Sequence, residues 1–216
     1  MNKNKHFLNY PSMTPHIGSE YISITHKRIL ILGESHYQPK GSKAHINCEL
    51  WYESTEASLT EKELGWIRIK QLIRDAKEER YRNKAHGIYR EISRSLSNAG
   101  LNLECYTQGI EHCMFMNYFQ RPAEETGKSI LVKQRDVEVS EETLKYVLDT
   151  YSPELIIVTS RLAGRYASKF LNTTNIPFVV TPHPSTAWWN REAKKYNGLK
   201  GREIFSDFLK NQEWIS

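Results

Sequence analysis

Residues 33–37, with the sequence GESHY, place a glycine and four polar or aromatic side chains in a row. Glu34 and His36 can exchange protons, and Ser35 could orient a water molecule or, if activated, act as a nucleophile. Gly33 would let the backbone turn sharply and expose its amide groups. The same residues could instead form an ordinary strand-to-helix turn that caps the next helix. The glycine spacing of a phosphate-binding loop is missing.

A side-chain amide, Asn117, stands at the end of a second apolar run, MFMN. Asparagine presents an acceptor and two donors in one plane, which matches the pairing face of a pyrimidine base. In the alternative interpretation, Asn117 bonds the backbone of the turn that leads to Pro122.

His183 lies between Pro182 and Pro184, and Ser185 follows. The two proline rings stiffen the loop and fix the direction of the imidazole. An imidazole held in this way can donate a hydrogen bond to charge that develops on a substrate oxygen. The alternative is a proline-rich loop without a chemical role.

Two adjacent tryptophans, Trp188 and Trp189, precede three cationic side chains, Arg191, Lys194 and Lys195. Stacking surface beside phosphate-neutralising charge is the combination that binds unstacked nucleic acid. The tryptophans could also be core residues, and at least one of them is expected to be buried.

Each of these motifs follows a short apolar run of strand length. The runs cover residues 28–32, 113–118, 155–159 and 177–181 and lack strict alternation, as in strands covered on both faces. Helical segments separate them, so we predict a parallel sheet with right-handed crossovers. Such sheets bind ligands at the carboxyl ends of their strands, where the motifs lie.

Helices are predicted from capping residues, apolar spacing and terminating Gly or Pro. Thr60 and Glu63 have the form of a capping box, and Gly100 and Pro153 end two of the helices. The predicted ranges are 60–79, 85–99, 140–152, 162–171 and 202–209.

The chain has 216 residues, 39% of them hydrophobic and 25% charged, which suits one folded α/β domain. We predict an N-terminal extension over residues 1–27 and a single domain over residues 28–216, with a helical insert at about 60–100. No secretory signal or membrane-spanning run is present, which favours the cytoplasm. Three scattered cysteines provide neither a disulfide framework nor a four-cysteine cluster.

The net charge is +5 and is unevenly distributed. Residues 161–210 hold nine Lys or Arg against three Asp or Glu, whereas residues 101–160 hold five against ten. The basic part contains the histidine and tryptophan motifs, which suits a polyanionic partner.

In their order along the chain, these motifs resemble those of the uracil-DNA glycosylase superfamily. Its first motif is G-Q-D-P-Y-H in the best-known branch, which Gly33 and Tyr37 fit, and G-E-A-P-G in the iron–sulfur branches, which Glu34 fits. The uracil-reading asparagine is similar to Asn117, and the closing H-P-S motif is similar to His183 and the two residues after it. The resemblance covers roughly residues 27–210.

The resemblance implies a three-layer αβα fold with a central four-stranded parallel sheet, and excision of a flipped, deaminated base from DNA. Asn117 would hold the pyrimidine, His183 would bond its O2, and Glu34, with or without Ser35, would hold the attacking water. Ser35 stands where the best-known branch has an aspartate. The implied catalytic residues are Glu34, Ser35 and His183; the substrate-binding residues are Gly33, His36, Tyr37, Asn117 and Ser185; the DNA-binding residues are Trp188, Trp189, Arg191, Lys194 and Lys195.

Tyr37 would close the pocket wall, and Trp188 or Trp189 would fill the space that the flipped base leaves. The aromatic residue that stacks on the base would be Trp51 or Tyr52. No metal and no cofactor is implied, and the partner is single- or double-stranded DNA.

Two other function classes stay open. A glycosylase-like fold could recognise a base without cutting it, which Ser35 in place of the aspartate favours. A metal-dependent hydrolase would need Glu34, His36, His112 and His183 to converge on one ion. A Ser35 esterase is disfavoured, because no G-x-S-x-G elbow is present.

Overall fold

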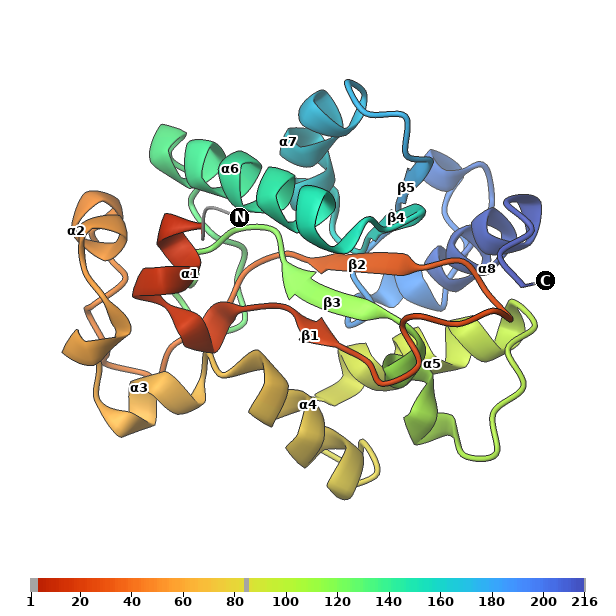
Figure 1. The fold of residues 1–216 in the computed structure, drawn as a ribbon, viewed down its shortest axis with the longest axis horizontal. Coiled ribbons are helices and arrows are strands. Elements are labelled where there is room, and N and C mark those ends of the chain that lie inside the picture. The colour runs from red at the N-terminus through yellow and green to blue at the C-terminus, as the bar shows by residue number, and fades with distance from the viewer. Residues whose placement is uncertain (1–3, 84–85, 216) are drawn as a thin grey trace.

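The computed structural model describes residues 4–83 and 86–215, and it shows an α/β fold with one five-stranded sheet. Four strands are parallel and neighbour one another in the order β3-β2-β4-β5. These strands confirm the four predicted runs; they are β2 (Ile29–Gly33), β3 (Met114–Asn117), β4 (Leu155–Val158) and β5 (Phe178–Val180). Their carboxyl ends meet at one edge of the sheet (Figure 1).

The prediction of a four-stranded, purely parallel sheet is corrected by a fifth strand from the N-terminal extension. β1 (His16–Ile17) pairs antiparallel with β3, which makes the sheet mixed. Two residues are too few to give an apolar run, so the sequence held no strand signal there. Within residues 4–27, the extension therefore joins the sheet of the main domain.

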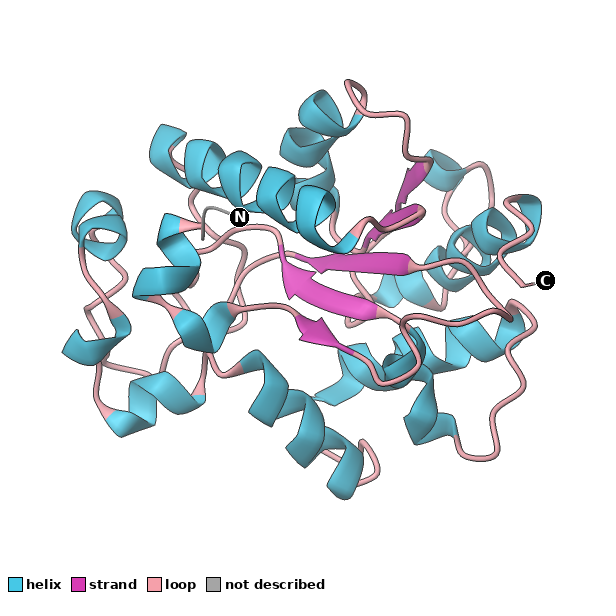
Figure 2. Cartoon of the chain, in the orientation of Figure 1, coloured by secondary structure: helices cyan, strands magenta, loops and turns pink. Residues whose placement is uncertain are grey.

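Helices cover both faces of the sheet, as Figure 1 shows. One face packs against α5 (Gly87–Asn98) and α8 (Gly201–Asn211), with α4 (Ile69–Glu78) beside them. The other face packs against α6 (Gln134–Tyr151) and α7 (Arg161–Leu171). The strands in Figure 2 accordingly lie between two groups of helices.

β2 shows why the apolar runs lack alternation. Ile29 and Ile31 belong to the core under α5 and α8, whereas Leu30 and Leu32 belong to the core under α6 and α7. All four side chains are 0% exposed, and each contributes roughly 1.5–3 kcal/mol through burial. A strand buried on both faces needs apolar side chains at every position.

The helix predicted over residues 60–79 is two helices, α3 (Glu61–Gly65) and α4. Its predicted start is confirmed, because Thr60 and Glu63 form the capping box. The break lets Ile67 enter a cluster with the N-terminal segment while Ile69 enters the main core. Tertiary burial thus overrides the helical spacing of the sequence.

Two other helix starts differ from the prediction. α6 begins at Gln134, six residues before the predicted start, and the Lys133 amide donates to Asp136 Oδ2 at 2.9 Å. Ser140 lies inside α6, where its hydroxyl donates to the Asp136 carbonyl oxygen. Residue 85, the predicted start of the next helix, lies outside the described residues, and α5 begins at Gly87.

A third cluster joins the N-terminal segment to the loop after β2. α1 (Lys5–Asn9) leads into Tyr10, which stacks on Trp51 of α2 (Cys48–Glu53) with ring centroids 4.5 Å apart. Trp51 also donates to the Gln120 carbonyl oxygen at 2.9 Å. The remaining short helical turns are η1 (Pro11–Met13), η2 (Glu56–Ser58), η4 (Tyr106–His112), η5 (Ala187–Trp189) and η6 (Lys194–Tyr196).

Over the ranges that the structure describes, no helix is both long enough and apolar enough to cross a bilayer.

Candidate functional site

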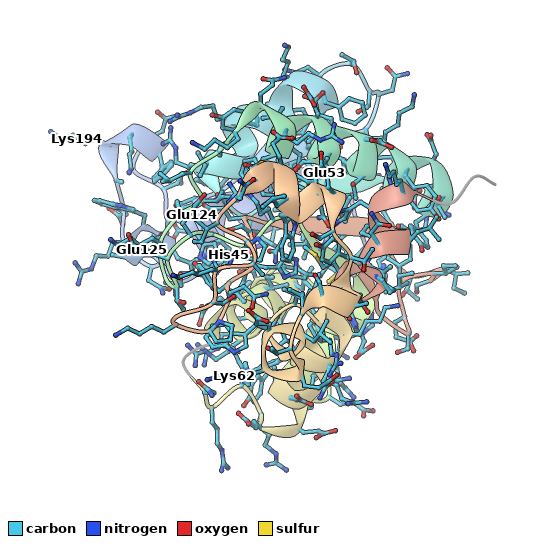
Figure 3. The ribbon with its side chains drawn as sticks, turned by 90° about the vertical axis from the view of Figure 1, so that its left-hand side faces the viewer. His45, Glu53, Lys62, Glu124, Glu125 and Lys194 are labelled. Atoms are coloured by element: carbon cyan, nitrogen blue, oxygen red, sulfur yellow. The ribbon has the colours of Figure 1, made fainter. Side chains whose placement is uncertain are left out.

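The candidate site lies at the carboxyl edge of the parallel strands, which faces the viewer in Figure 3. α2 and α3 lie in front of part of this edge, and His45 is near the middle of the view with Glu124 close by. Lys194 projects at one side, where the chain beyond β5 reaches the surface. The edge therefore has one half covered by N-terminal elements and one half formed by the loop after β5.

Gly33 and Asn117 are partners across β2 and β3. A Cβ atom on Gly33 would lie 2.2 Å from Asn117 Oδ1, so the glycine makes room for the amide. This corrects the expectation of a sharp turn, because Gly33 is the last residue of a regular strand. Asn117 is partly exposed, and its carbonyl oxygen accepts a hydrogen bond from Gln120 Nε2.

Glu34 is held from both sides. Its carbonyl oxygen accepts the Phe119 amide at 2.9 Å, which ties it to the chain after β3. Its Oε2 accepts the Ser160 hydroxyl at 2.5 Å, which ties it to the chain after β4. Ser160 is the N-cap of α7 and also accepts the Ala163 amide at 3.2 Å. The carboxylate therefore has a fixed position between two strand ends.

His183 is held in one orientation by Ser185. The Ser185 amide donates to His183 Nδ1 at 3.2 Å, and the Ser185 hydroxyl is 2.7 Å from the same nitrogen. Because Nδ1 accepts, the neutral imidazole carries its proton on Nε2. Burial lowers the pKa of His183, and the nearby Glu34 carboxylate opposes that shift. His183 is thus a neutral donor close to Glu34.

The two residues after Ser35 have different surroundings. Tyr37 is partly buried, and burial together with the Glu34 charge raises the pKa of its phenol. His36 is only 3% exposed, and burial lowers its pKa to about 3. This corrects the expectation that His36 contacts substrate, because its ring lies in the interior.

The two adjacent tryptophans differ completely in their exposure to solvent. Trp188 is 41% exposed, whereas Trp189 is 0% exposed and packs edge-on against Phe205 of α8. Trp189 is therefore a core residue, which corrects its assignment to DNA binding and to filling the vacated space. Trp188 alone keeps an accessible ring.

Lys195 links Trp188 to a second aromatic ring. Its Nζ lies 4.5 Å from the Trp188 ring centroid and 5.1 Å from that of Tyr196. Arg161, at the start of α7, lies 5.3 Å from the Tyr196 centroid. We call these four residues the aromatic-cation row; Arg191 and Lys194, which are close to Lys195 in the sequence, are exposed as well.

Neither aromatic proposed to stack on a base is accessible. Trp51 is 1% and Tyr52 is 7% exposed. Trp51 stacks on Tyr10, and the Tyr52 hydroxyl donates to Asp136 Oδ1 at 2.9 Å. Both side chains hold α2 against the domain.

The four residues of the metal-hydrolase alternative do not come together. His112 ends η4, just before β3 begins, and bonds His26 at 3.0 Å, so it lies at the opposite edge from Glu34. Among the side chains of residues 4–83 and 86–215, no three His, Cys, Asp or Glu form a group suited to a metal ion.

Two surface hollows lie away from the site. One of about 290 Å³ lies between η1 and α4, and one of about 380 Å³ lies around the amino end of β5. Glu34, Asn117 and His183 line neither of them.

The sequence prediction missed three residues of this edge. Ser160 gave only the signal of a helix N-cap, and its bond to Glu34 needs the strand order β2-β4 to be known. Arg161 and Tyr196 are 35 positions apart in the sequence and meet only in the fold.

No family model and no curated protein sequence matches this chain.

Proposed function

We propose that this protein is a uracil-DNA glycosylase-like hydrolase that excises a deaminated base, such as uracil, from DNA. One observation carries the proposal: Asn117 and Glu34 stand at the ends of the neighbouring strands β3 and β2, and His183, a neutral imidazole with its proton on Nε2, lies near enough to Glu34 to interact with its charge. An amide, a carboxylate and an imidazole donor are the groups that base recognition, water activation and leaving-group stabilisation require.

Asn117 would read the base. Its amide lies over Gly33, where no side chain competes for the space. One oxygen and one NH₂ group match the N3–H and O4 of uracil, and the reverse pattern of cytosine would leave both groups mismatched. Discrimination against cytosine would follow from those unpaired polar groups.

His183 would stabilise the departing base. When the C1′–N1 bond breaks, its electron pair leaves with the uracil, and negative charge collects on O2. The Nε2–H can donate to that oxygen without changing its protonation state. Ser185 keeps the ring in this orientation through Nδ1, so no reorganisation is required at the moment of reaction.

Glu34 would act on the sugar side. Its negative charge stabilises the cationic sugar, and it accepts a proton from the water whose oxygen bonds C1′. That proton passes to solvent, and the excised base takes up a proton in its turn. Glu34 would thus have the role of the aspartate that the best-known branch has where this chain has Ser35. Ser35 itself would help to orient the water.

The aromatic-cation row would hold the DNA. A base inside a duplex is inaccessible, so it must be flipped out of the stack or be in a single strand. Trp188 can stack on a base, while Lys195 and Arg161 can neutralise phosphates. Arg191 and Lys194 extend the positive surface beside this row. No cofactor takes part, and we place the activity in cytoplasmic base-excision repair.

Base excision tests the proposal. Labelled single- and double-stranded DNA with one uracil, hypoxanthine or xanthine is incubated with protein, and abasic sites are then cleaved with alkali. Asn117→Ala and His183→Ala should each lower the rate by about 10²-fold or more. Arg135→Gln, on the exposed face of α6, is the matched control and should cleave at the wild-type rate.

The outcome decides between two functions of one site. If the wild type cleaves and both variants do not, the result supports the glycosylase proposal. Binding without cleavage of any base would contradict it and would favour a base-recognition module, which the serine at position 35 already allows.

A further inference from the structure

We infer that Ser160 is a positioning residue for Glu34, and that this serine fixes which oxygen of the carboxylate faces the substrate. The inference rests on the proposed function, because it names a further residue of the same site. It starts from the 2.5 Å hydrogen bond in which the Ser160 hydroxyl donates to Glu34 Oε2. Hydrogen bonds to an ionised acceptor are shorter and stronger than neutral ones.

The serine is itself buried and hydrogen-bonded. It is 1% exposed, and its oxygen accepts the Ala163 amide as the N-cap of α7. A hydroxyl has a single proton, and the helix amide occupies a lone pair of the oxygen. The proton is therefore directed to Glu34.

Thr159, the residue before the serine, fixes the position of Ser160 along the strand direction. The Thr159 amide and hydroxyl both donate to the Leu32 carbonyl oxygen, at 2.7 and 2.9 Å. These two bonds join the end of β4 to β2 just before Glu34. These bonds therefore fix the position of Ser160 relative to the Glu34 carboxylate, although the two residues are far apart in the sequence.

The remaining oxygen is the functional one. Within the described ranges, Glu34 Oε1 makes no hydrogen bond, and the side chain is partly exposed. One oxygen is thus anchored and the other is an open acceptor. A water or a cationic sugar can meet Oε1 in a defined direction, and a misplacement of about 1 Å can cost 10²-fold in rate.

Substitution must separate this role from helix capping. Ser160→Gly removes the hydroxyl but keeps most of the capping preference, whereas Ser160→Thr keeps both the hydroxyl and the cap. Thr60→Gly is the matched control, because Thr60 caps α3 in the same way without touching Glu34. Glu34→Gln sets the effect of losing the charge.

Two readouts are needed. The first is the single-turnover excision rate, which Ser160→Gly should lower about tenfold to hundredfold without a matching change in DNA affinity. Ser160→Thr should recover it to within about threefold, and Thr60→Gly should leave it unchanged. The second is binding of DNA with a cationic pyrrolidine abasic analogue, compared with the neutral tetrahydrofuran analogue.

The cationic analogue tests the carboxylate without turnover. The wild type should bind it about tenfold more tightly than the neutral one, because the charge of Glu34 faces the sugar. Glu34→Gln should lose this preference, Ser160→Gly should lose most of it, and Ser160→Thr should keep it.

The two proposals fail in different ways. If the wild type excises no base but its cationic preference disappears in Ser160→Gly, the glycosylase proposal is wrong and the positioning role stands. If Ser160→Gly equals the wild type in both readouts, or if the wild type shows no cationic preference, the positioning role is overturned.

Discussion

The carboxyl edge of the sheet has two halves that use the same residue types in opposite ways. The cap half, under α1 and α2, buries His6, His36 and Trp51 at 7%, 3% and 1% exposure. The loop half, after β5, leaves His183 partly exposed and Trp188 at 41% exposure. Imidazoles and indoles thus line both halves, but only one half offers them to a ligand.

Charge follows the same division. In the cap half, Arg121 and Asp136 are both 0% exposed and pair through two bonds of 2.8 Å, from Nε and Nη2. In the loop half, Lys195 lies on the ring of Trp188 at the surface. A charge that is fully paired inside the protein serves the fold, whereas an exposed one remains available to a polyanion.

The largest expected effect is in the cap half. Asp136→Asn should lower the free energy of unfolding by about 3–5 kcal/mol, because it removes the fully buried carboxylate of the pair and leaves the guanidinium only Glu124 as a counter-charge. Equilibrium urea denaturation measures this loss. Glu138→Gln, in an exposed pair with Arg135, is the control and should change stability very little. Equal stability of Asp136→Asn and the wild type would show that the cap half does not depend on this pair.

The second effect compares neighbours in sequence. Trp189→Ala should lower the free energy of unfolding by about 3–5 kcal/mol, because it empties a space in the core beside Phe205. Trp188→Ala should leave unfolding almost unchanged and weaken single-stranded DNA binding by about 1–3 kcal/mol. Denaturation and fluorescence anisotropy separate the two. If instead Trp188→Ala lowered the stability and Trp189→Ala weakened DNA binding, the loop half would not be the binding surface.

The fold was largely predictable because its signal is local. The apolar runs that contain Leu30 and Ile156 mark strands that are buried on both faces. The helical segments between these runs imply that the strands pair in parallel. β1 and the break before Ile69 were not predictable. Both are decided by partners far away in the sequence, and a two-residue strand or a helical break has no periodicity of its own.

The third effect is pH dependence in the cap half. His6 and His36 have pKa values of about 3 because of burial, and the proximity of His36 lowers that of His6 further. Unfolded histidine binds a proton near pH 6.5, so stability is lost as the pH falls below 6.5 toward 3. Within the described residues, the Nε2 atom of each ring is buried and has no hydrogen-bond partner, so a proton gained there would stay unpaired.

His6→Phe isolates this contribution. Phenylalanine keeps the stack on Tyr10 but cannot bind a proton. Between pH 7 and pH 5.5, the variant should lose about 1 kcal/mol less stability than the wild type. Urea denaturation at both pH values measures the difference, and identical losses would mean that His6 is already solvated in the folded protein.

The positions of the candidate residues in the fold were predictable, but their exposure was not. Asn117, Glu34 and His183 follow strands, so the sequence alone places them at one edge. Whether His36 or Trp189 faces the solvent depends on α1 and α8, which the local sequence does not reveal. Proximity along the chain therefore predicts which edge a side chain belongs to, and only packing decides whether it is accessible there.

The smallest expected effect concerns Lys195, a single cation of the loop half. Lys195→Gln should weaken single-stranded DNA binding by only about two- to fivefold, because an exposed cation–π contact and one phosphate contact are each weak. It should also reduce the slope of log affinity against log salt by roughly 0.7, the value for one phosphate on a single strand. Trp188→Ala should weaken binding more but leave that slope unchanged, since stacking releases no counterion. A slope that responds to Trp188 and not to Lys195 would mean that the cation serves only to hold the ring, and that phosphate is bound elsewhere.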